Sequence, residues 1–169
     1  TMKKYGDLLS SPLDMPHSLQ VGIAYKIRPT VEITADYRWL LWEDVKAYGS
    51  SIFNGGGFGW KDQHGLKLGV EWQVGEKWTL MAGYAYSNSP IRENGVFLAG
   101  LAPVIFEHHL TAGLSYKINE KHAVHVAFGG APKHQLQESG GGDLLSILGR
   151  GTKVEVSAIS AALGYSFFW

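Results

Sequence analysis

The chain has 169 residues, a formal net charge of +0 at pH 7 and no cysteine. The neutral balance argues against a nucleic-acid partner, and the lack of thiols excludes a disulfide framework and a thiolate metal site. The length suits a single unit over residues 1–169. A mean hydropathy of -0.06 and the lack of a long apolar run argue against a transmembrane helix. A transmembrane strand needs only about 9–11 residues, so a membrane barrel fits this composition.

Alternation of apolar and polar residues, the pattern of a β-strand, dominates the chain. In the first segment Leu19, Val21 and Ile23 share one face, and Gln20 and Gly22 share the other. The same alternation predicts seven strands, over residues 18–27, 31–41, 66–74, 78–87, 109–118, 124–128 and 153–169. In the last of them the apolar positions change parity, which predicts a β-bulge near Ser157-Ala158.

Short and long connections alternate between these strands. The short ones lie at Arg28-Pro29-Thr30, Gly75-Glu76-Lys77 and Asn119-Glu120-Lys121, and the long ones over residues 49–63, 88–107 and 132–151. In a bacterial outer-membrane barrel the tight turns face the periplasm and the long loops face outside. Both end strands then run inward, which requires an odd strand number, whereas single-chain bacterial barrels have an even one. We therefore expect further strands upstream of Thr1, with one more strand within residues 1–16 as the alternative. A signal peptide has either been removed or belongs to a missing N-terminal part.

The two faces of the predicted strands differ in polarity. One face carries mostly tryptophan, tyrosine, leucine, valine and isoleucine, and the other carries Lys26, Glu32, Asp36, Arg38, Lys67, Glu71, His109, Lys117 and His125 among small polar residues. A soluble barrel turns its apolar face inward, and a membrane barrel turns it toward lipid. Aromatic residues gather near both strand ends, as in the belts at two membrane interfaces. We therefore predict an all-β, antiparallel transmembrane β-barrel whose apolar face contacts outer-membrane lipid.

Several segments resemble known outer-membrane proteins. Residues 163–169 resemble the final-strand signal of such proteins, which implies insertion by the barrel-assembly machinery. Seven segments resemble the FadL/TodX family of outer-membrane long-chain fatty-acid and hydrocarbon transporters: 17–25, 31–39, Gly59-Trp60-Lys61-Asp62, 78–86, Ser89-Pro90-Ile91, 108–116 and the strand around Val124. The resemblance covers about residues 12–169. It implies the C-terminal half of a fourteen-stranded barrel, without the family's N-terminal plug and early strands, and passive transport of hydrophobic compounds without a cofactor.

Three cations on the polar face are candidates for ligand binding: Arg38, Lys67 and Lys117. If the ligand is a fatty acid, they would attract its carboxylate. The residue pattern favours a different role for the charges, in which Glu32, Asp36 and Arg38 pair with Lys67 and Glu71 across neighbouring strands and brace the lumen.

The second long connection is unusually apolar over residues 96–106, and Phe97, Leu98 and Phe106 are candidates for ligand contact there. An exposed apolar loop of this kind either folds back as a lid over the barrel mouth or forms a landing surface for an apolar ligand. Residues 144–148 in the third long connection offer a second patch of the same kind.

Other functions find less support in the sequence. His108 and His109 point to opposite faces of a strand, so we expect no metal site there. The glycine triplets at 55–57 and 140–142 are not followed by the Lys-Ser/Thr pair of a phosphate loop. The sequence also contains no nucleophile elbow, which disfavours an esterase or phospholipase. The alternatives that stay open are a soluble lipocalin-like binding barrel and a structural outer-membrane barrel that transports nothing.

Overall fold

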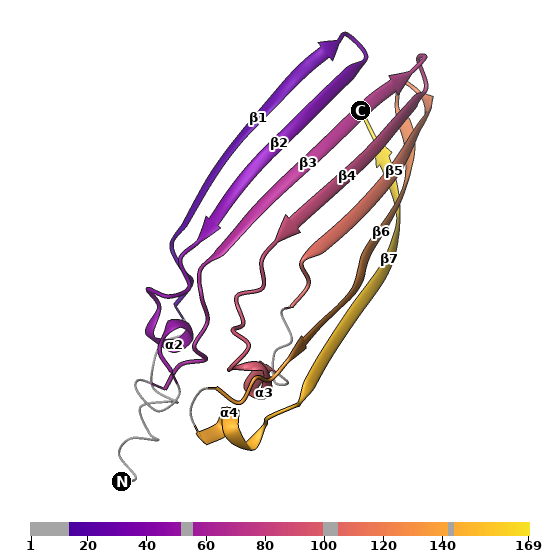
Figure 1. Cartoon of the computed structure of the whole chain (residues 1–169). Helices are drawn as coiled ribbons and strands as arrows, with labels where there is room; N and C mark the ends of the chain where they lie inside the picture. The colour runs from indigo at the N-terminus through magenta and orange to yellow at the C-terminus, as the bar shows by residue number, and fades with distance from the viewer. Residues whose placement is uncertain (1–13, 52–55, 100–104, 142–143) are drawn as a thin grey trace.

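The computed structural model describes residues 14–51, 56–99, 105–141 and 144–169. These residues form one antiparallel sheet in which each strand pairs with the next one along the chain (Figure 1). The strands are β1 (Ser18–Arg28), β2 (Val31–Leu40), β3 (Gln63–Val74), β4 (Trp78–Ser87), β5 (His108–Asn119), β6 (His122–Gln137) and β7 (Lys153–Phe167). Short helices α2 (Lys46–Gly49), α3 (Val96–Ala99) and α4 (Leu144–Leu148) lie in the connections. Within the described ranges no helix is long and apolar enough to cross a membrane.

The alternation of tight turns and long connections is confirmed. Tight turns join β1 to β2, β3 to β4 and β5 to β6, and Gly75 in the second of them has φ 70°, a left-handed conformation that favours glycine. The described residues of the long connections, which run over 41–62, 88–107 and 138–152, gather at the other end of the sheet (Figure 1). The C-terminus lies at the turn end, where the amide of Phe168 donates to the carbonyl of Lys121 over 2.8 Å.

Two predictions about the last hairpin are wrong. β6 continues to Gln137, so the third long connection begins after that residue and not at 132. The irregularity lies in β6 and not in the last strand, because Ala131 pairs with Ala158 and His134 pairs with Val156, which leaves one extra residue in β6. This bulge contains Pro132, which has no amide to donate to a ladder. β7 keeps one alternation of its two faces throughout. Its apolar residues change face because Val154 and Val156 pack against the long connections, whereas residues from Ile159 onward have their apolar side chains on the opposite face.

The two faces of the sheet differ in coverage. β4 alternates strictly: every second residue from Thr79 to Ser87 is half-buried, and the residues between them, from Trp78 to Tyr86, are exposed. We call the more covered face the inner face and the other the outer face. The outer face exposes large apolar side chains on every strand, among them Ile23, Leu68 and Leu163. This distribution is the reverse of a soluble barrel, in which the apolar side chains fill the interior.

The long connections share a small core, which we call the loop cap. Its buried members are Trp60, Ile91, Val96 and Ile105, and Trp42, Tyr48, Phe58, Leu136, Val154 and Val156 pack around them. The rings of Tyr48 and Trp60 stack with centroids 5.1 Å apart. Because Val154 and Val156 extend from β7 into this core, the loop cap lies on the inner face of the sheet.

Candidate functional site

A cavity of about 200 Å³ lies on the inner face near the loop cap, and we call it the cationic pocket. Arg38 of β2 and Lys67 of β3 both line it, together with His109 of β5 and polar side chains such as Gln63. The register explains this grouping, because Arg38 lies opposite Gly65, which has no side chain to fill the space between β2 and β4. The structure thus brings together two of the three predicted cations.

The predicted ladder of opposite charges is not formed. Lys67 lies opposite Asp36 in the register, but within the described residues neither Lys67 nor Arg38 has an ion-pair partner within 4.0 Å. The Asp36 carboxylate leans the other way, since a Cβ built on Gly22 of β1 would lie 2.2 Å from its Oδ1. In the described part of the chain the two cations of the pocket therefore form no ion pair with a carboxylate.

The apolar connection reaches this pocket through Phe106. Its ring packs against His109, with centroids 5.8 Å apart. The pocket is also tied to the loop cap by Gln63, whose amide nitrogen donates to the Asn88 carbonyl at 3.1 Å and whose oxygen accepts from the indole of Trp42 at 3.4 Å. Movement of the loop cap therefore bears directly on the pocket.

The other predicted candidates lie elsewhere. Lys117 is at the turn end of β5, where its ammonium pairs with Glu120 at 2.9 Å. Leu98 belongs to α3, and its side chain lies outside the described residues. Phe97 of α3 is 44% exposed and lines a second cavity, which lies within the loops. The six candidates thus do not form one site.

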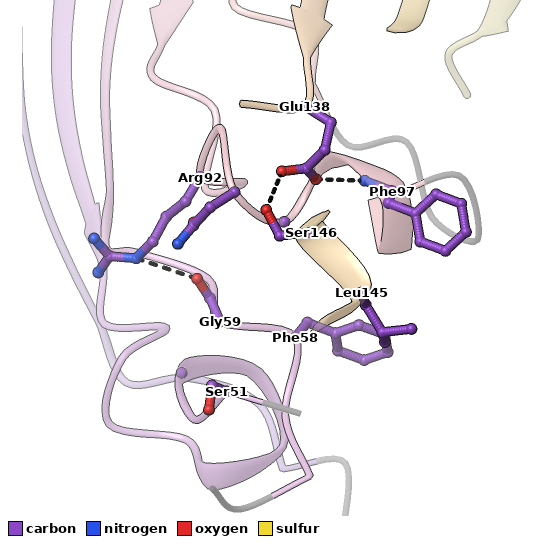
Figure 2. Close-up of a pocket in the computed structure, with 11 residues that line it drawn as sticks. Ser51, Phe58, Gly59, Arg92, Phe97, Glu138, Leu145 and Ser146 are labelled. Atoms are coloured by element: carbon purple, nitrogen blue, oxygen red, sulfur yellow. Dashed lines mark hydrogen bonds between the residues drawn. The ribbon is translucent and has the colours of Figure 1, made fainter. Parts of the chain in front are cut away.

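The second cavity has a volume of about 300 Å³ and is bordered by all three long connections (Figure 2). Glu138, only 2% exposed, forms part of its wall. Its carboxylate accepts hydrogen bonds from the amide of Phe97 at 3.0 Å and from Oγ of Ser146 at 2.6 Å, so it ties α3 to α4. Arg92 joins the first two connections, because its Nε donates to the carbonyl of Gly59 at 3.2 Å and its guanidinium pairs with Glu43.

Sequence reasoning missed Glu138 and Arg92. Both lie in connections without periodicity, and their bonds to the other connections, to Phe97, Gly59 and Glu43, span 33 to 49 positions. It also missed why the two motifs of the family resemblance occur together. The amide of Lys61, in the first motif, donates to the carbonyl of Pro90, in the second, over 2.8 Å. Asp62 accepts from the indole of Trp39 at 3.1 Å. These motifs therefore hold the loop cap together.

The histidines do not form a metal centre in the described residues. His108 lies on the outer face against Tyr84, and His109 lies on the inner face, so their predicted separation is confirmed. At the turn end, His125 lies on the inner face between two serines, with Nδ1 2.7 Å from Ser115 Oγ and Nε2 3.0 Å from Ser166 Oγ. In the described part of the chain no three histidine or acidic side chains gather as metal ligands would.

An antiparallel sheet with an apolar, exposed outer face and a polar inner face beneath packed loops is the architecture of a transmembrane β-barrel, here a partial one. The family model described as outer membrane protein transport protein (OMPP1/FadL/TodX) matches residues 9–167. The chain belongs to this family, whose members are outer-membrane proteins.

Solved structures agree on the fold. The Pseudomonas putida toluene transporter TodX is 18% identical with a TM-score of 0.57 and covers 92% of this chain and 35% of its own. A TodX monoaromatic hydrocarbon channel deltaS2 mutant is 18% identical with a TM-score of 0.62, and the match covers 93% of this chain and 36% of the mutant. The CymD monoaromatic hydrocarbon channel is 17% identical with a TM-score of 0.57, and the match covers 93% of this chain and 37% of CymD. The chain thus spans about a third of the length of these channels. No curated protein matches it.

Proposed function

We propose that this chain is part of a channel through which hydrophobic compounds cross the outer membrane passively. The observation that carries the proposal is the inverted polarity of the sheet. Side chains such as Ile23 and Leu163 are 68% and 83% exposed on the outer face, where lipid would cover them. The polar inner face would line the path, and the long connections would form its outer entrance. Family membership supports the same role.

The entrance offers apolar surface to an arriving molecule. Leu144, Ile147 and Leu148 of α4 are 60%, 57% and 71% exposed, and Phe97 of the neighbouring α3 is 44% exposed. Exposed apolar groups in this number on one side of a protein are typical of an interaction surface. A ligand would adsorb there, pass the loop cap and reach the cationic pocket on the inner face, without a covalent step.

Two substrate classes differ in what they require of the pocket. A long-chain fatty acid carries a carboxylate, and Arg38 and Lys67 are both placed to hold it. A monoaromatic hydrocarbon, the cargo named for the similar solved channels, has no charge to hold. Each charge-assisted hydrogen bond contributes about 1.5–3 kcal/mol, so loss of either cation should lower carboxylate uptake about tenfold or more.

The proposal is tested by uptake into vesicles that contain the whole channel of which this chain is proposed to be a part. We expect R38A and K67A to slow uptake of a labelled fatty acid and to leave uptake of labelled toluene unchanged. The matched control is K117A, which removes a cation at the other end of the strands. If both variants leave both rates unchanged, the pocket does not select a carboxylate. If wild-type vesicles take up neither compound faster than empty vesicles, the proposal fails, and a structural barrel without transport takes its place.

A soluble lipocalin-like barrel is the other alternative, and it predicts a chain that folds as a monomer in plain buffer. Its apolar side chains would have to turn inward, onto the face that carries Arg38 and Lys67 here.

We also propose that the barrel-assembly machinery inserts the chain. The final strand supports this, because Tyr165 and Phe167 are 61% and 52% exposed on its outer face.

A further inference from the structure

Three histidines lie on the outer face in the same arrangement, which we call the histidine clamp. In each clamp a histidine ring packs against two aromatic rings that are two residues apart on the neighbouring strand. The clamps are His64 with Tyr37 and Trp39, His108 with Tyr84 and Tyr86, and His122 with Tyr165 and Phe167. Centroid separations run from 5.1 Å for His108 and Tyr86 to 6.1 Å for His64 and Tyr37.

Each clamp also fixes one ring nitrogen. Nδ1 lies 2.7 Å from the Tyr37 hydroxyl in His64 and 2.8 Å from the Tyr84 hydroxyl in His108, and His122 bonds to Tyr165 in the same way. When the tyrosine donates to Nδ1, the proton of the neutral imidazole is on Nε2. Among the described residues, Nε2 of these three histidines has no hydrogen-bond partner. In this tautomer each clamp presents an oriented N–H donor.

The clamps lie at two heights that match the thickness of a bilayer. His108 is the first residue of β5, and His122 pairs with Asn119, the last residue of this twelve-residue strand. At a rise of about 3.4 Å per residue the two ends are about 37 Å apart. A barrel strand tilts by about 40°, which gives a height of about 28 Å. The hydrocarbon core of a bilayer is about 30 Å thick.

We propose that the histidine clamps bind the phosphate groups of membrane lipids at both interfaces of the outer membrane. The Nε2–H group is the donor, and a phosphate oxygen is a strong acceptor at this depth. The clamps are set in apolar surface: Leu110, two residues from His108, is 58% exposed, and Phe167, beside His122, is 52% exposed. Acyl chains would cover these side chains, so the partner is a lipid headgroup and not free phosphate. The inference requires membrane insertion but not transport.

The test is ¹⁵N–³¹P dipolar dephasing by solid-state NMR, on the full chain with ¹⁵N-labelled histidine in phosphatidylglycerol vesicles. We expect dephasing at Nε2 of the three clamp histidines. His125 is the internal control, because it lies on the inner face with both nitrogens bonded to serines. H108F should remove one of the three signals, while the conservative Y84F should weaken the signal of His108 and leave that of His64 unchanged. Dephasing no stronger at the clamp histidines than at His125 overturns the proposal.

Two further arms identify the source of the phosphorus. In vesicles of a glycolipid without phosphorus, supplied with inorganic phosphate, we expect no dephasing. Equal dephasing in that arm contradicts lipid binding, because free phosphate would then be sufficient. Insertion is measured on the same samples by protection from added protease, and uptake is measured separately. An inserted chain without dephasing therefore refutes the clamps alone, and an inserted chain with dephasing but without uptake refutes only the proposed function.

Discussion

The most direct test of the loop cap is the replacement of Glu138 by leucine. The Glu138 carboxylate is 2% exposed and accepts hydrogen bonds from the amide of Phe97 at 3.0 Å and from Oγ of Ser146 at 2.6 Å. Leucine has a similar volume but no acceptor. E138L therefore removes the shared acceptor of three hydrogen bonds, from Phe97, Ser146 and Gly140, at a place where water enters poorly, and separates α3 from α4.

The size of the effect follows from these three hydrogen bonds. The amide of Phe97 loses its acceptor, which costs about 1–3 kcal/mol, and each of the other two bonds contributes about 0.5–1.5 kcal/mol, so E138L should destabilise the closed loop cap by about 2–6 kcal/mol. E138Q should cost less, about 1 kcal/mol, because its amide oxygen still accepts from Phe97 and the hydroxyl of Ser146 can reverse its role. The sheet should be unaffected, because its ladder is made of backbone hydrogen bonds.

Hydrogen–deuterium exchange at the amide of Lys61 reports the opening. This amide donates to Pro90 O over 2.8 Å, joins two connections and does not touch Glu138. E138L should speed its exchange by about 30-fold or more, since about 1.4 kcal/mol corresponds to a factor of ten. The control is E155Q, which breaks the ion pair between Glu155 and Lys133. Their side chains are 47% and 65% exposed, so this variant should change the exchange rate at Lys61 little. Unchanged exchange at Lys61 in E138L would refute a cap that opens as a unit.

Two further predictions address the cap and the orientation of the sheet. A Cβ at Gly149 would lie 2.5 Å from Cβ of Phe97, so G149V should destabilise the cap by about 1–3 kcal/mol in the same exchange assay. G141V, where the nearest atom is 3.5 Å away, should not. In variants that keep one tryptophan, lipids with brominated acyl chains should quench Trp78, which is 44% exposed on the outer face, and spare Trp60, which is 8% exposed. The reverse result would mean that the sheet is oriented inside out.

The membrane-spanning strands were predictable because one face of each strand contacts lipid and the other contacts the lumen, which requires alternating apolar and polar residues. For β4 the predicted and observed bounds coincide at Trp78–Ser87, since its alternation continues to both ends. The end of β6 was not predictable. Beyond Pro132 the strand pairs with the first residues of β7, at the level of the loop cap, where its two faces no longer meet lipid and lumen. Leu136 is the one apolar residue among residues 133–137, so the sequence there has no alternation of polar and apolar residues.

The candidate site was predictable only in part, and for a related reason. Parity placed Arg38 and Lys67 on one face, and the cavity that they share confirms it. The failure of the charge ladder depends on Gly22, whose missing side chain lets Asp36 turn toward β1. Such an effect requires the register between strands, which alternation does not supply. The hydrogen bond from the amide of Phe97 to the carboxylate of Glu138 joins residues 41 positions apart, in segments without periodicity.

The loop cap and the cationic pocket both lie on the path that we propose for the ligand, which gives the mutation of Glu138 a second consequence. Gln63 lines the pocket and bonds to Trp42, a member of the cap, so a molecule that reaches the pocket from the loop side has to pass between the connections that the cap joins. If the closed cap limits entry, E138L should raise the rate of hydrocarbon uptake while it weakens the cap. Uptake that falls in step with the loss of exchange protection would instead mean that the closed cap is the form that captures the ligand.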